Sequence, residues 1–168
     1  MPATTSKNGI RLRLLRSTIQ ALDKLSLLTR RRTREWITGT AGVGRRGEEA
    51  AYLYLRSLGY VIVARRWRTA TLRGDIDLIA WQNEQLCMIE VKTRSTRDAF
   101  AAEFAVDDRK QQMLRRMANA YLRQVRRPDT RLNSYLGSRE VTPRFDIVSV
   151  YLNSDPPQIE LREGCFAF

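Results

Sequence analysis

The chain contains no histidine, and this absence removes several kinds of hydrolase site from consideration. Ser-His-Asp triads, histidine general bases and histidine-ligated zinc sites all need an imidazole. Two cysteines occur, Cys87 and Cys165, and neither has zinc-type or CxxC spacing, so we expect a reduced compartment. A hydrolase built from this sequence would have to work with carboxylates and a metal ion.

Long apolar runs are also missing. No uncharged apolar run approaches the ~20 residues of a membrane helix, and the N-terminus has no clean apolar segment of the signal-peptide kind. We therefore expect no transmembrane segment. The 168 residues, 43% of them hydrophobic, are enough for one compact core and too few for two ordinary domains.

Positive charge is in excess. The chain has 30 Lys and Arg residues against 18 Asp and Glu, a net charge of +12, which predicts a polyanionic partner, with nucleic acid favoured over an anionic membrane. Residues 1–46 hold 11 basic and 2 acidic residues, whereas the rest of the chain has a net charge of +3. Positive and negative charges nearly cancel after residue 46, so the many carboxylates of this part of a basic protein need an explanation.

The N-terminal part is predicted to be a basic amphipathic arm and linker over residues 1–41, ahead of a folded domain over residues 42–168. Apolar residues at helical spacing run through this arm at Ile10, Leu14, Leu15, Ile19, Leu22 and Leu25. Four interpretations stay open from composition: a loosely ordered extension, a nucleic-acid arm, a membrane-surface helix and an organellar transit segment.

The main body is predicted to begin with a helix, continue with three antiparallel strands, and end with a second helix and two strands. The expected helices cover residues 45–58, closed by Gly59, and 106–126. The expected strands begin with residues 60–63, which lead into a basic segment, and continue with 76–81, 86–91, 144–152 and 158–161. Residues 95–103 are expected to be irregular and residues 127–143 to form a loop.

The second and third strands form a predicted hairpin around the turn at Gln82 to Gln85, and this hairpin carries the candidate chemistry. Alternation places Asp75 and Asp77 on one face, and it gives Glu90 and Lys92 a common face. Asp77 and Glu90 suit a Mg²⁺ or Mn²⁺ ion, while the Lys92 ammonium would lie near an attacking water. The residues alone leave open a solvated cross-strand charge cluster instead.

A second acid-x-Lys triplet, Asp108-Arg109-Lys110, lacks flanking strand residues and is predicted to be a helix start. Glu48 and Glu49 are expected in the first turn of the earlier helix, where carboxylates complement the helix dipole. A second interpretation is open for Glu48. Its spacing from Tyr52 and Leu55 puts these three residues on one helix face, so Glu48 would face the hairpin as an additional metal-site acid.

Basic residues mark two candidate nucleic-acid contacts. The strand end with Arg65, Arg66, Trp67 and Arg68 suits phosphate contact and base stacking, or is a packed strand end. The later helix has a basic face that is either solvated or a rail for a phosphate backbone, formed by Arg109, Lys110, Arg115, Arg116 and Arg123. The predicted nucleic-acid contacts are therefore the four residues of the strand end together with Lys110 and Arg94.

Several motifs together resemble the YraN family. They are Gly44-x-x-Gly47-Glu48 with Ala51 and Leu55, Gly59-Tyr60, GDIDLIA, IEVKTR, Lys110 with Leu114, Ala118 and Tyr121-Leu122, RFDIV, and the closing Ala167-Phe168. The similarity spans about residues 43–168. That family is grouped with Holliday-junction-resolvase-like nucleases in the restriction-endonuclease-like PD-(D/E)xK superfamily.

This resemblance implies an α/β fold, with a restriction-endonuclease-like mixed β-sheet flanked by helices, a cytoplasmic location and DNA as the substrate. It also implies Asp77 and Glu90 as metal ligands, the Val91 carbonyl as a third ligand, Lys92 as the catalytic lysine and Glu48 as a helix acid of the same site. Family members usually have Glu where this chain has Asp75.

Three hypotheses of function follow. The first is a nuclease that depends on Mg²⁺ or Mn²⁺ and hydrolyses DNA phosphodiesters, including those of branched or flapped DNA. The second is a nucleic-acid-binding protein that has the nuclease fold but little or no catalysis. The third is an interaction protein that uses its arm and whose hairpin acids are structural. Cutting a junction needs two active sites, so the first hypothesis implies a homodimer.

Overall fold

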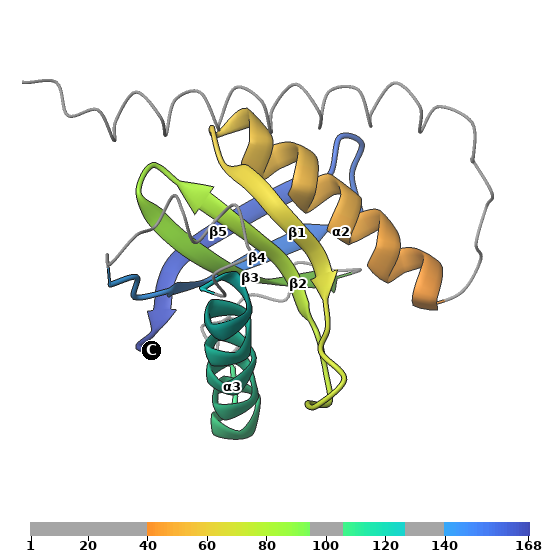
Figure 1. The fold of residues 1–168 in the computed structure, drawn as a ribbon. Coiled ribbons are helices and arrows are strands. Elements are labelled where there is room, and N and C mark those ends of the chain that lie inside the picture. The colour runs from red at the N-terminus through yellow and green to blue at the C-terminus, as the bar shows by residue number, and fades with distance from the viewer. Residues whose placement is uncertain (1–39, 95–105, 127–139) are drawn as a thin grey trace, which may run out of the picture. The chain divides into compact units, whose positions relative to one another are not determined.

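The computed structural model describes residues 40–94, 106–126 and 140–168 of the chain (Figure 1). These residues form two helices and five strands. The helices are α2 (Thr40–Ser57) and α3 (Asp108–Val125). The strands are β1 (Val61–Trp67), β2 (Ile76–Gln82), β3 (Gln85–Arg94), β4 (Arg144–Tyr151) and β5 (Gln158–Phe166). The predicted arm before residue 40, the stretch 95–103 and the loop part 127–139 lie outside the described residues.

The strands form one mixed sheet in chain order, β1-β2-β3-β4-β5. Neighbouring strands are antiparallel except β3 and β4, which are parallel. A parallel pair needs a long crossover connection, and α3 lies in that connection between β3 and β4. The predicted α/β fold with a mixed sheet and flanking helices is therefore confirmed, as are the hairpin of β2 and β3 and the antiparallel order of the first three strands.

Both faces of the sheet carry buried apolar residues, which explains why it has a helix on each side (Figure 1). On one face Leu78 pairs with Ile89, and on the other Ile79 pairs with Met88; all four are at most 1% exposed. Helix α2 packs on the face of Leu78, where the Arg65 guanidinium lies 4.4 Å from the Tyr52 ring centroid. Helix α3 contacts the opposite face.

Helix α2 approaches β3 closely at one glycine. A Cβ atom built on Gly47 would collide with the side chain of Thr93, so no larger residue fits there without displacement. The neighbouring residue in the chain is Glu48, and the close approach brings this acid to the end of the sheet where β2 begins. The requirement for glycine thus bears on the geometry of the candidate site.

Helix α2 starts earlier than the sequence predicted. It begins at Thr40 rather than Arg45, and it includes Gly42 and Gly44. Glycine in a helix costs about 1 kcal/mol relative to alanine, and the burial of Gly42 shows that packing prevails here. Because the first turn contains no acid, the dipole explanation for Glu48 and Glu49 is wrong.

The end of α2 agrees with the prediction, whereas the end of the last strand does not. Gly59, with a φ of 86°, closes α2 as predicted, and the Tyr60 N–H donates to the Leu55 carbonyl over 3.0 Å. Strand β5 extends to Phe166, five residues beyond the predicted end at Leu161. The reason is apolar packing, since the Phe166 ring stacks on Phe145 with centroids 4.4 Å apart.

Polar residues around the buried Asp146 connect β2, β4, β5 and the residue that precedes β1. We call Tyr60, Gln82, Arg144, Asp146 and Glu163 the Arg144 network. The Arg144 guanidinium donates to both carboxylate oxygens of Asp146 over 2.8 Å, to the Gln82 side-chain oxygen over 2.7 Å and to the Tyr60 hydroxyl over 3.0 Å. The Tyr60 hydroxyl donates to Glu163 over 2.7 Å. Asp146 is 1% exposed, so these contacts satisfy a charge inside the core.

Candidate functional site

Two carboxylates face each other across the paired strands β2 and β3. Leu78 pairs with Ile89, so the next residues toward the start of β2, Asp77 and Glu90, are neighbours on the adjoining strands. Both side chains lie on the face opposite to Leu78, as alternation requires. We call Asp77 and Glu90 the acid pair.

Asp77 is held in a specific orientation but in an unfavourable electrostatic setting. Its Oδ2 atom accepts a hydrogen bond of 2.7 Å from the Val91 N–H. Burial raises the pKa of Asp77 to about 7, and the negative charges of Glu90 and Glu48 contribute to the rise. The hydrogen bond from Val91 and the positive charge of Lys110 act in the opposite direction. The fold therefore maintains like charges near each other that oppose ionisation.

Glu90 has one oxygen engaged and one without a partner. Its Oε1 atom forms an ion pair with the Lys110 ammonium of α3 at 2.9 Å. Its Oε2 atom is buried and has no hydrogen-bond partner among the described residues. A buried carboxylate oxygen without a donor is costly, and a bound cation is one group that would satisfy it.

Lys92 follows Glu90 by two residues, so its Cβ atom lies on the same face of β3. It is half-buried, and its register partner on β4 is Ser149, whose buried hydroxyl has no hydrogen-bond partner in the described ranges. The positive charge of Lys92 also acts on Cys165 of β5. Burial raises the pKa of this thiol, and Lys92 is one of the groups that lower it by a smaller amount. The structure thus places the predicted catalytic lysine beside the acid pair on the sheet.

Glu48 reaches the site from α2. Its charge acts on Asp77, and its carboxylate lies 3.7 Å from Nε of Arg66. Glu48 is thus close enough to Asp77 to influence it electrostatically, and its role as a metal-site acid stays a prediction. Glu49 instead forms an ion pair with Arg65 at 2.7 Å.

Asp75 does not join the acid pair. It precedes β2, and its Oδ2 atom lies 2.9 Å from Arg68 and 4.0 Å from Arg66. The predicted common face of Asp75 and Asp77 does not bring both acids into one site, because strand pairing begins only at Ile76. Asp75 acts as the counter-charge of the basic strand end.

The basic corner, which we define as Arg65, Arg66, Trp67 and Arg68, lies at the end of β1. Arg66 and Arg68 are exposed by 51% and 65%, while Arg65 is bound to Glu49. The Trp67 ring packs edge-on against Tyr121 of α3 with centroids 5.4 Å apart, so the packed-strand-end interpretation holds for this tryptophan. The structure thus leaves Arg66 and Arg68 exposed beside Asp75 and gives Trp67 a packing role.

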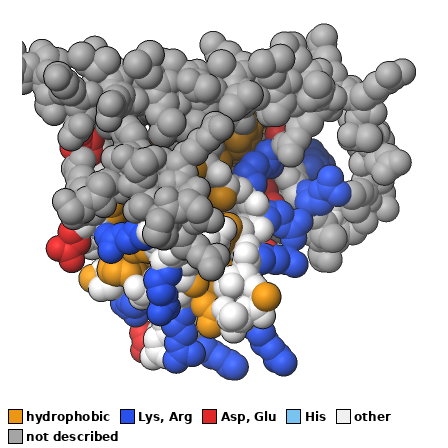
Figure 2. Space-filling view, in the orientation of Figure 1, with side chains coloured by type: hydrophobic (Ala, Val, Ile, Leu, Met, Phe, Trp, Pro, Cys, Tyr) orange, Lys and Arg blue, Asp and Glu red, His pale blue; other side chains and the backbone are white. Residues whose placement is uncertain are grey.

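The basic face of α3 is narrower than predicted. Arg109, Arg116 and Arg123 are exposed and recur every seven residues, so they form one stripe along the helix. Arg115 is not part of this stripe, because its Nε donates to the Ala167 carbonyl over 2.9 Å and its guanidinium lies over the Phe166 ring. On the face shown in Figure 2, basic side chains are much more numerous than acidic ones.

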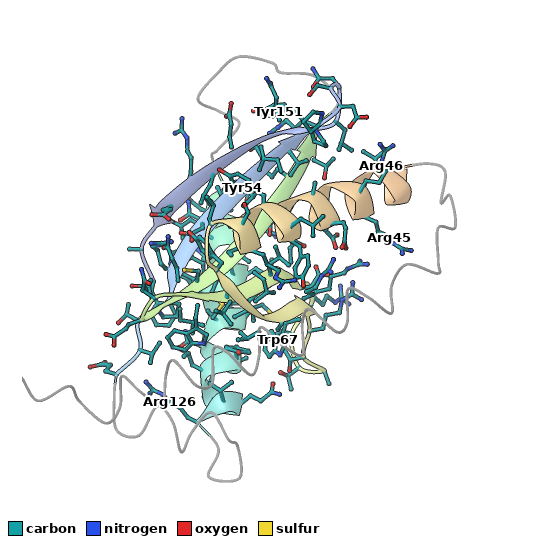
Figure 3. The ribbon with its side chains drawn as sticks, turned by 90° about the horizontal axis from the view of Figure 1, so that it is seen from above. Arg45, Arg46, Tyr54, Trp67, Arg126 and Tyr151 are labelled. Atoms are coloured by element: carbon teal, nitrogen blue, oxygen red, sulfur yellow. The ribbon has the colours of Figure 1, made fainter. Side chains whose placement is uncertain are left out.

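Two further basic residues lie in the first half of α2. Arg45 and Arg46 are exposed and point away from the sheet (Figure 3). Sequence reasoning placed Arg94 among the nucleic-acid contacts, and the structure places it at the end of β3, two residues after Lys92 and half-buried. The described side chains therefore combine a small acidic site with a wider basic surface.

Sequence reasoning missed two features. It assigned Lys110 to a phosphate rail and did not foresee its contact with Glu90, which depends on how α3 packs. It also noticed RFDIV without recognising the Arg144 network. The signal available was the Arg-x-Asp spacing in a predicted strand, which puts an arginine and an acid on one face.

The acid pair has a limited set of donor atoms for a metal ion. In the described part of the chain, no group of three or more His, Cys, Asp and Glu side chains has the arrangement that could hold a metal. The acid pair alone fits a hard cation such as Mg²⁺, which is commonly held by one or two carboxylates and keeps several waters. The unpartnered Oε2 atom of Glu90 is the observation in favour of this fit.

No helix within residues 40–94, 106–126 and 140–168 is long and apolar enough to cross a membrane.

Comparison with known proteins identifies the family. The model of the family described as "Uncharacterised protein family UPF0102" matches residues 47–150. A UPF0102 protein of Koribacter versatilis is 49% identical over 124 residues, which cover 73% of this chain and 78% of that protein. A UPF0102 protein of Solibacter usitatus is 44% identical over 123 residues, which cover 73% and 84%. One from Porphyromonas gingivalis is 35% identical over 125 residues, which cover 73% and 82%. The matched region contains the acid pair, Glu48, Lys92, Lys110 and Arg144, and the chain belongs to the UPF0102 family, also called the YraN family.

Proposed function

We propose that this protein is a nuclease that hydrolyses DNA phosphodiesters with the help of Mg²⁺ or Mn²⁺. The observation that carries the proposal is the acid pair: Asp77 and Glu90 are neighbours on paired strands, and a buried Glu90 oxygen has no partner among the described residues. Carboxylates with strongly perturbed pKa values gather at functional sites. The order of α2, β1, β2, β3, α3 and β4 agrees with a restriction-endonuclease-like fold, which we propose for this chain.

In this proposal Asp77 and Glu90 hold the cation, with the Val91 carbonyl as a third ligand and Glu48 close enough to influence Asp77 electrostatically. When bound, such a cation lowers the pKa of a coordinated water and stabilises charge on phosphate oxygens. The Val91 N–H keeps the Asp77 carboxylate oriented. The Lys92 ammonium positions the attacking water or neutralises the charge that develops on the phosphate.

DNA would be bound by the exposed basic residues around this site. Arg66 and Arg68 of the basic corner and the stripe of Arg109, Arg116 and Arg123 supply phosphate contacts, with Arg94 and Lys110 nearer the acid pair. The proposed substrate is DNA, including branched or flapped forms, and the proposed location of the protein is the cytoplasm. Cutting both strands of a junction would require two copies of the site, so the proposal includes a homodimer.

A cleavage assay tests the nuclease proposal. Single-stranded, duplex and branched DNA are incubated with the purified full chain and Mg²⁺ or Mn²⁺, for the wild type, Asp77→Asn and Lys92→Gln. We expect each substitution to lower the cleavage rate by about 10²-fold or more, because each removes a group that acts on the developing charge. Asp75→Asn is the matched control and should retain cleavage. Equal cleavage by the wild type and Asp77→Asn would reject the assignment.

A second candidate is a DNA-binding protein with this fold but little or no catalysis. The observations that favour it are the ion pair of Lys110 with Glu90 and the lack, in the described ranges, of a three-acid metal group. Binding in EDTA that weakens steeply with salt, without cleavage under any metal condition, would support this candidate. Affinity that does not change with salt would instead indicate a protein partner.

A further inference from the structure

The contact between Lys110 and Glu90 joins α3 to the acid pair. The Lys110 ammonium lies 2.9 Å from Oε1 of Glu90, and the two side chains are exposed by 33% and 15%. Lys110 lies in the first turn of α3, where its backbone N–H donates to Oδ1 of Asp107 over 2.8 Å. The helix start is therefore fixed by its cap, and the long side chain reaches from there to β3.

Lys110 supplies positive charge to both acids. It pairs directly with Glu90, and its charge is one of the influences that lower the pKa of Asp77. The Oε2 atom of Glu90 has no hydrogen-bond partner in the described part of the chain, so the ammonium satisfies only half of this carboxylate. The acid pair thus has a counter-charge within the chain, but an incomplete one.

We infer that Lys110 is an exchangeable counter-ion: it holds Glu90 while the acid pair has no divalent cation and leaves Glu90 when one binds. The inference rests on the proposed function, since it takes the acid pair as the cation site. The released ammonium stays within reach of the site, where its partner becomes a phosphate oxygen of DNA. Lys110 is then a positioning residue that links cation binding to DNA binding.

Two properties of the contact favour exchange. The ion pair is partly exposed, and such pairs contribute little to stability, so a divalent cation would displace the ammonium readily. Lysine is a compact point charge on a flexible stem and makes one contact here, whereas arginine would tend to form a two-pronged and more persistent pair with a carboxylate.

The low lysine content makes a direct test possible in the unmodified protein. The chain has four lysines, Lys7, Lys24, Lys92 and Lys110. Reductive methylation with formaldehyde, followed by peptide mass spectrometry, reports the accessibility of each amine. We expect the labelling rate of Lys110 to rise severalfold when Mn²⁺ is added, with Lys7 and Lys24 as internal references that do not change. In Asp77→Asn the rise should be absent. An unchanged rate for Lys110 in a protein that binds Mn²⁺ would overturn the inference.

Affinity measurements give a second test. Titration calorimetry with Mn²⁺ compares the wild type with Lys110→Met, Lys110→Arg and the neighbouring control Arg109→Met. We expect Lys110→Met to bind Mn²⁺ about 5- to 10-fold more tightly, because a like charge beside the cation is removed. Lys110→Arg should bind Mn²⁺ no more tightly than the wild type, because it keeps that charge and pairs more persistently with a carboxylate, and Arg109→Met should be unchanged. Equal or weaker binding by Lys110→Met would overturn the inference.

The two proposals fail in different ways. If neither the wild type nor Lys110→Met binds Mn²⁺ in a manner that Asp77→Asn removes, the proposed function fails and this inference fails with it. If binding depends on Asp77 but is the same in Lys110→Met, only the exchange is rejected and the nuclease proposal stands.

Discussion

The sheet carries two clusters of charged residues, and they differ in how their charges are balanced. In the Arg144 network, one guanidinium binds both oxygens of a buried aspartate and the side-chain oxygens of Tyr60, Gln82 and Glu163. In the acid pair, two carboxylates are neighbours and one buried oxygen has no partner among the described residues. The first cluster lies near the start of β4 and the second near the start of β2.

This difference agrees with a structural role for the Arg144 network and with the functional role that we propose for the acid pair. A polar network in which each charge has its partner rigidifies the core and specifies how strands meet. A group of like charges raises the free energy of the folded state, and such a group is expected where a ligand completes the site. Both clusters contain groups with shifted pKa values, so a shifted pKa alone does not distinguish them. They differ in whether each charged group has its partner within the cluster.

The largest effect on stability is expected from breaking the Arg144 network. Arg144→Met leaves Asp146, which is 1% exposed, as a buried charge without its main partner. We expect the free energy of unfolding to fall by about 3–5 kcal/mol, measured by urea denaturation. The double substitution Arg144→Met with Asp146→Leu should be destabilised less than the single one, because both charges are gone. Arg123→Met, on the exposed side of α3, is the control and should change stability by less than about 0.5 kcal/mol.

Removing a charge from the acid pair should raise the free energy of unfolding, and by less than breaking the Arg144 network lowers it. In the folded protein the pKa of Asp77 is raised to about 7, against about 3.9 in an unfolded chain. Between these pH values the folded state binds more protons, so the free energy of unfolding falls as pH rises through this window. We expect a decrease of about 1–3 kcal/mol between pH 4 and pH 8 in EDTA from this group.

The substitution Asp77→Asn removes the ionisation while keeping an acceptor for the Val91 N–H. This variant should be more stable than the wild type at pH 8 and no more stable at pH 4, where the wild-type carboxyl is protonated. Parallel pH profiles for the two proteins, measured by thermal or urea unfolding, would contradict the proposed repulsion. Asp75→Asn has no reason to abolish the pH dependence and serves as the matched control.

The smallest effect on stability is expected for the stripe on α3, whose charges face solvent. Replacing Arg109, Arg116 and Arg123 by Gln together should change the free energy of unfolding by less than about 0.5 kcal/mol. Affinity for DNA should nevertheless fall, and the slope of log affinity against log salt should decrease by roughly one unit for each phosphate that is no longer neutralised. An unchanged salt slope would show that the stripe does not bind DNA.

Much of the fold could be predicted because its signals are local. The alternation of apolar and polar residues around the turn at Asn83 defined the hairpin, and helical spacing defined α3. The common face of Asp77 and Glu90 could be predicted for the same reason, since alternation in paired strands gives it directly. The start of α2 was missed because Gly42 and Gly44 disfavour a helix locally.

Contacts between distant elements could not be predicted in this way. The ion pair of Lys110 with Glu90 depends on the packing of α3 against β3, and Arg115 binds the C-terminal Ala167 for a similar reason. In the Arg144 network, the Arg-x-Asp spacing indicates only that Arg144 and Asp146 share a face. No spacing in the sequence indicates their contacts with Tyr60, Gln82 and Glu163. Strand β5 was predicted too short because its extension depends on Phe166 stacking against Phe145.

The short turn between β2 and β3 also bears on the order of folding. Asp77 and Glu90 belong to one hairpin with a two-residue turn, Asn83 and Glu84, whereas the Arg144 network needs β1, β2, β4 and β5 together. Local pairings form with a smaller decrease in chain entropy than distant ones. Repulsion between the two acids would then be met early, so Asp77→Asn should mainly accelerate refolding, whereas Arg144→Met should mainly accelerate unfolding. The acid pair would thus slow the formation of the sheet that holds it.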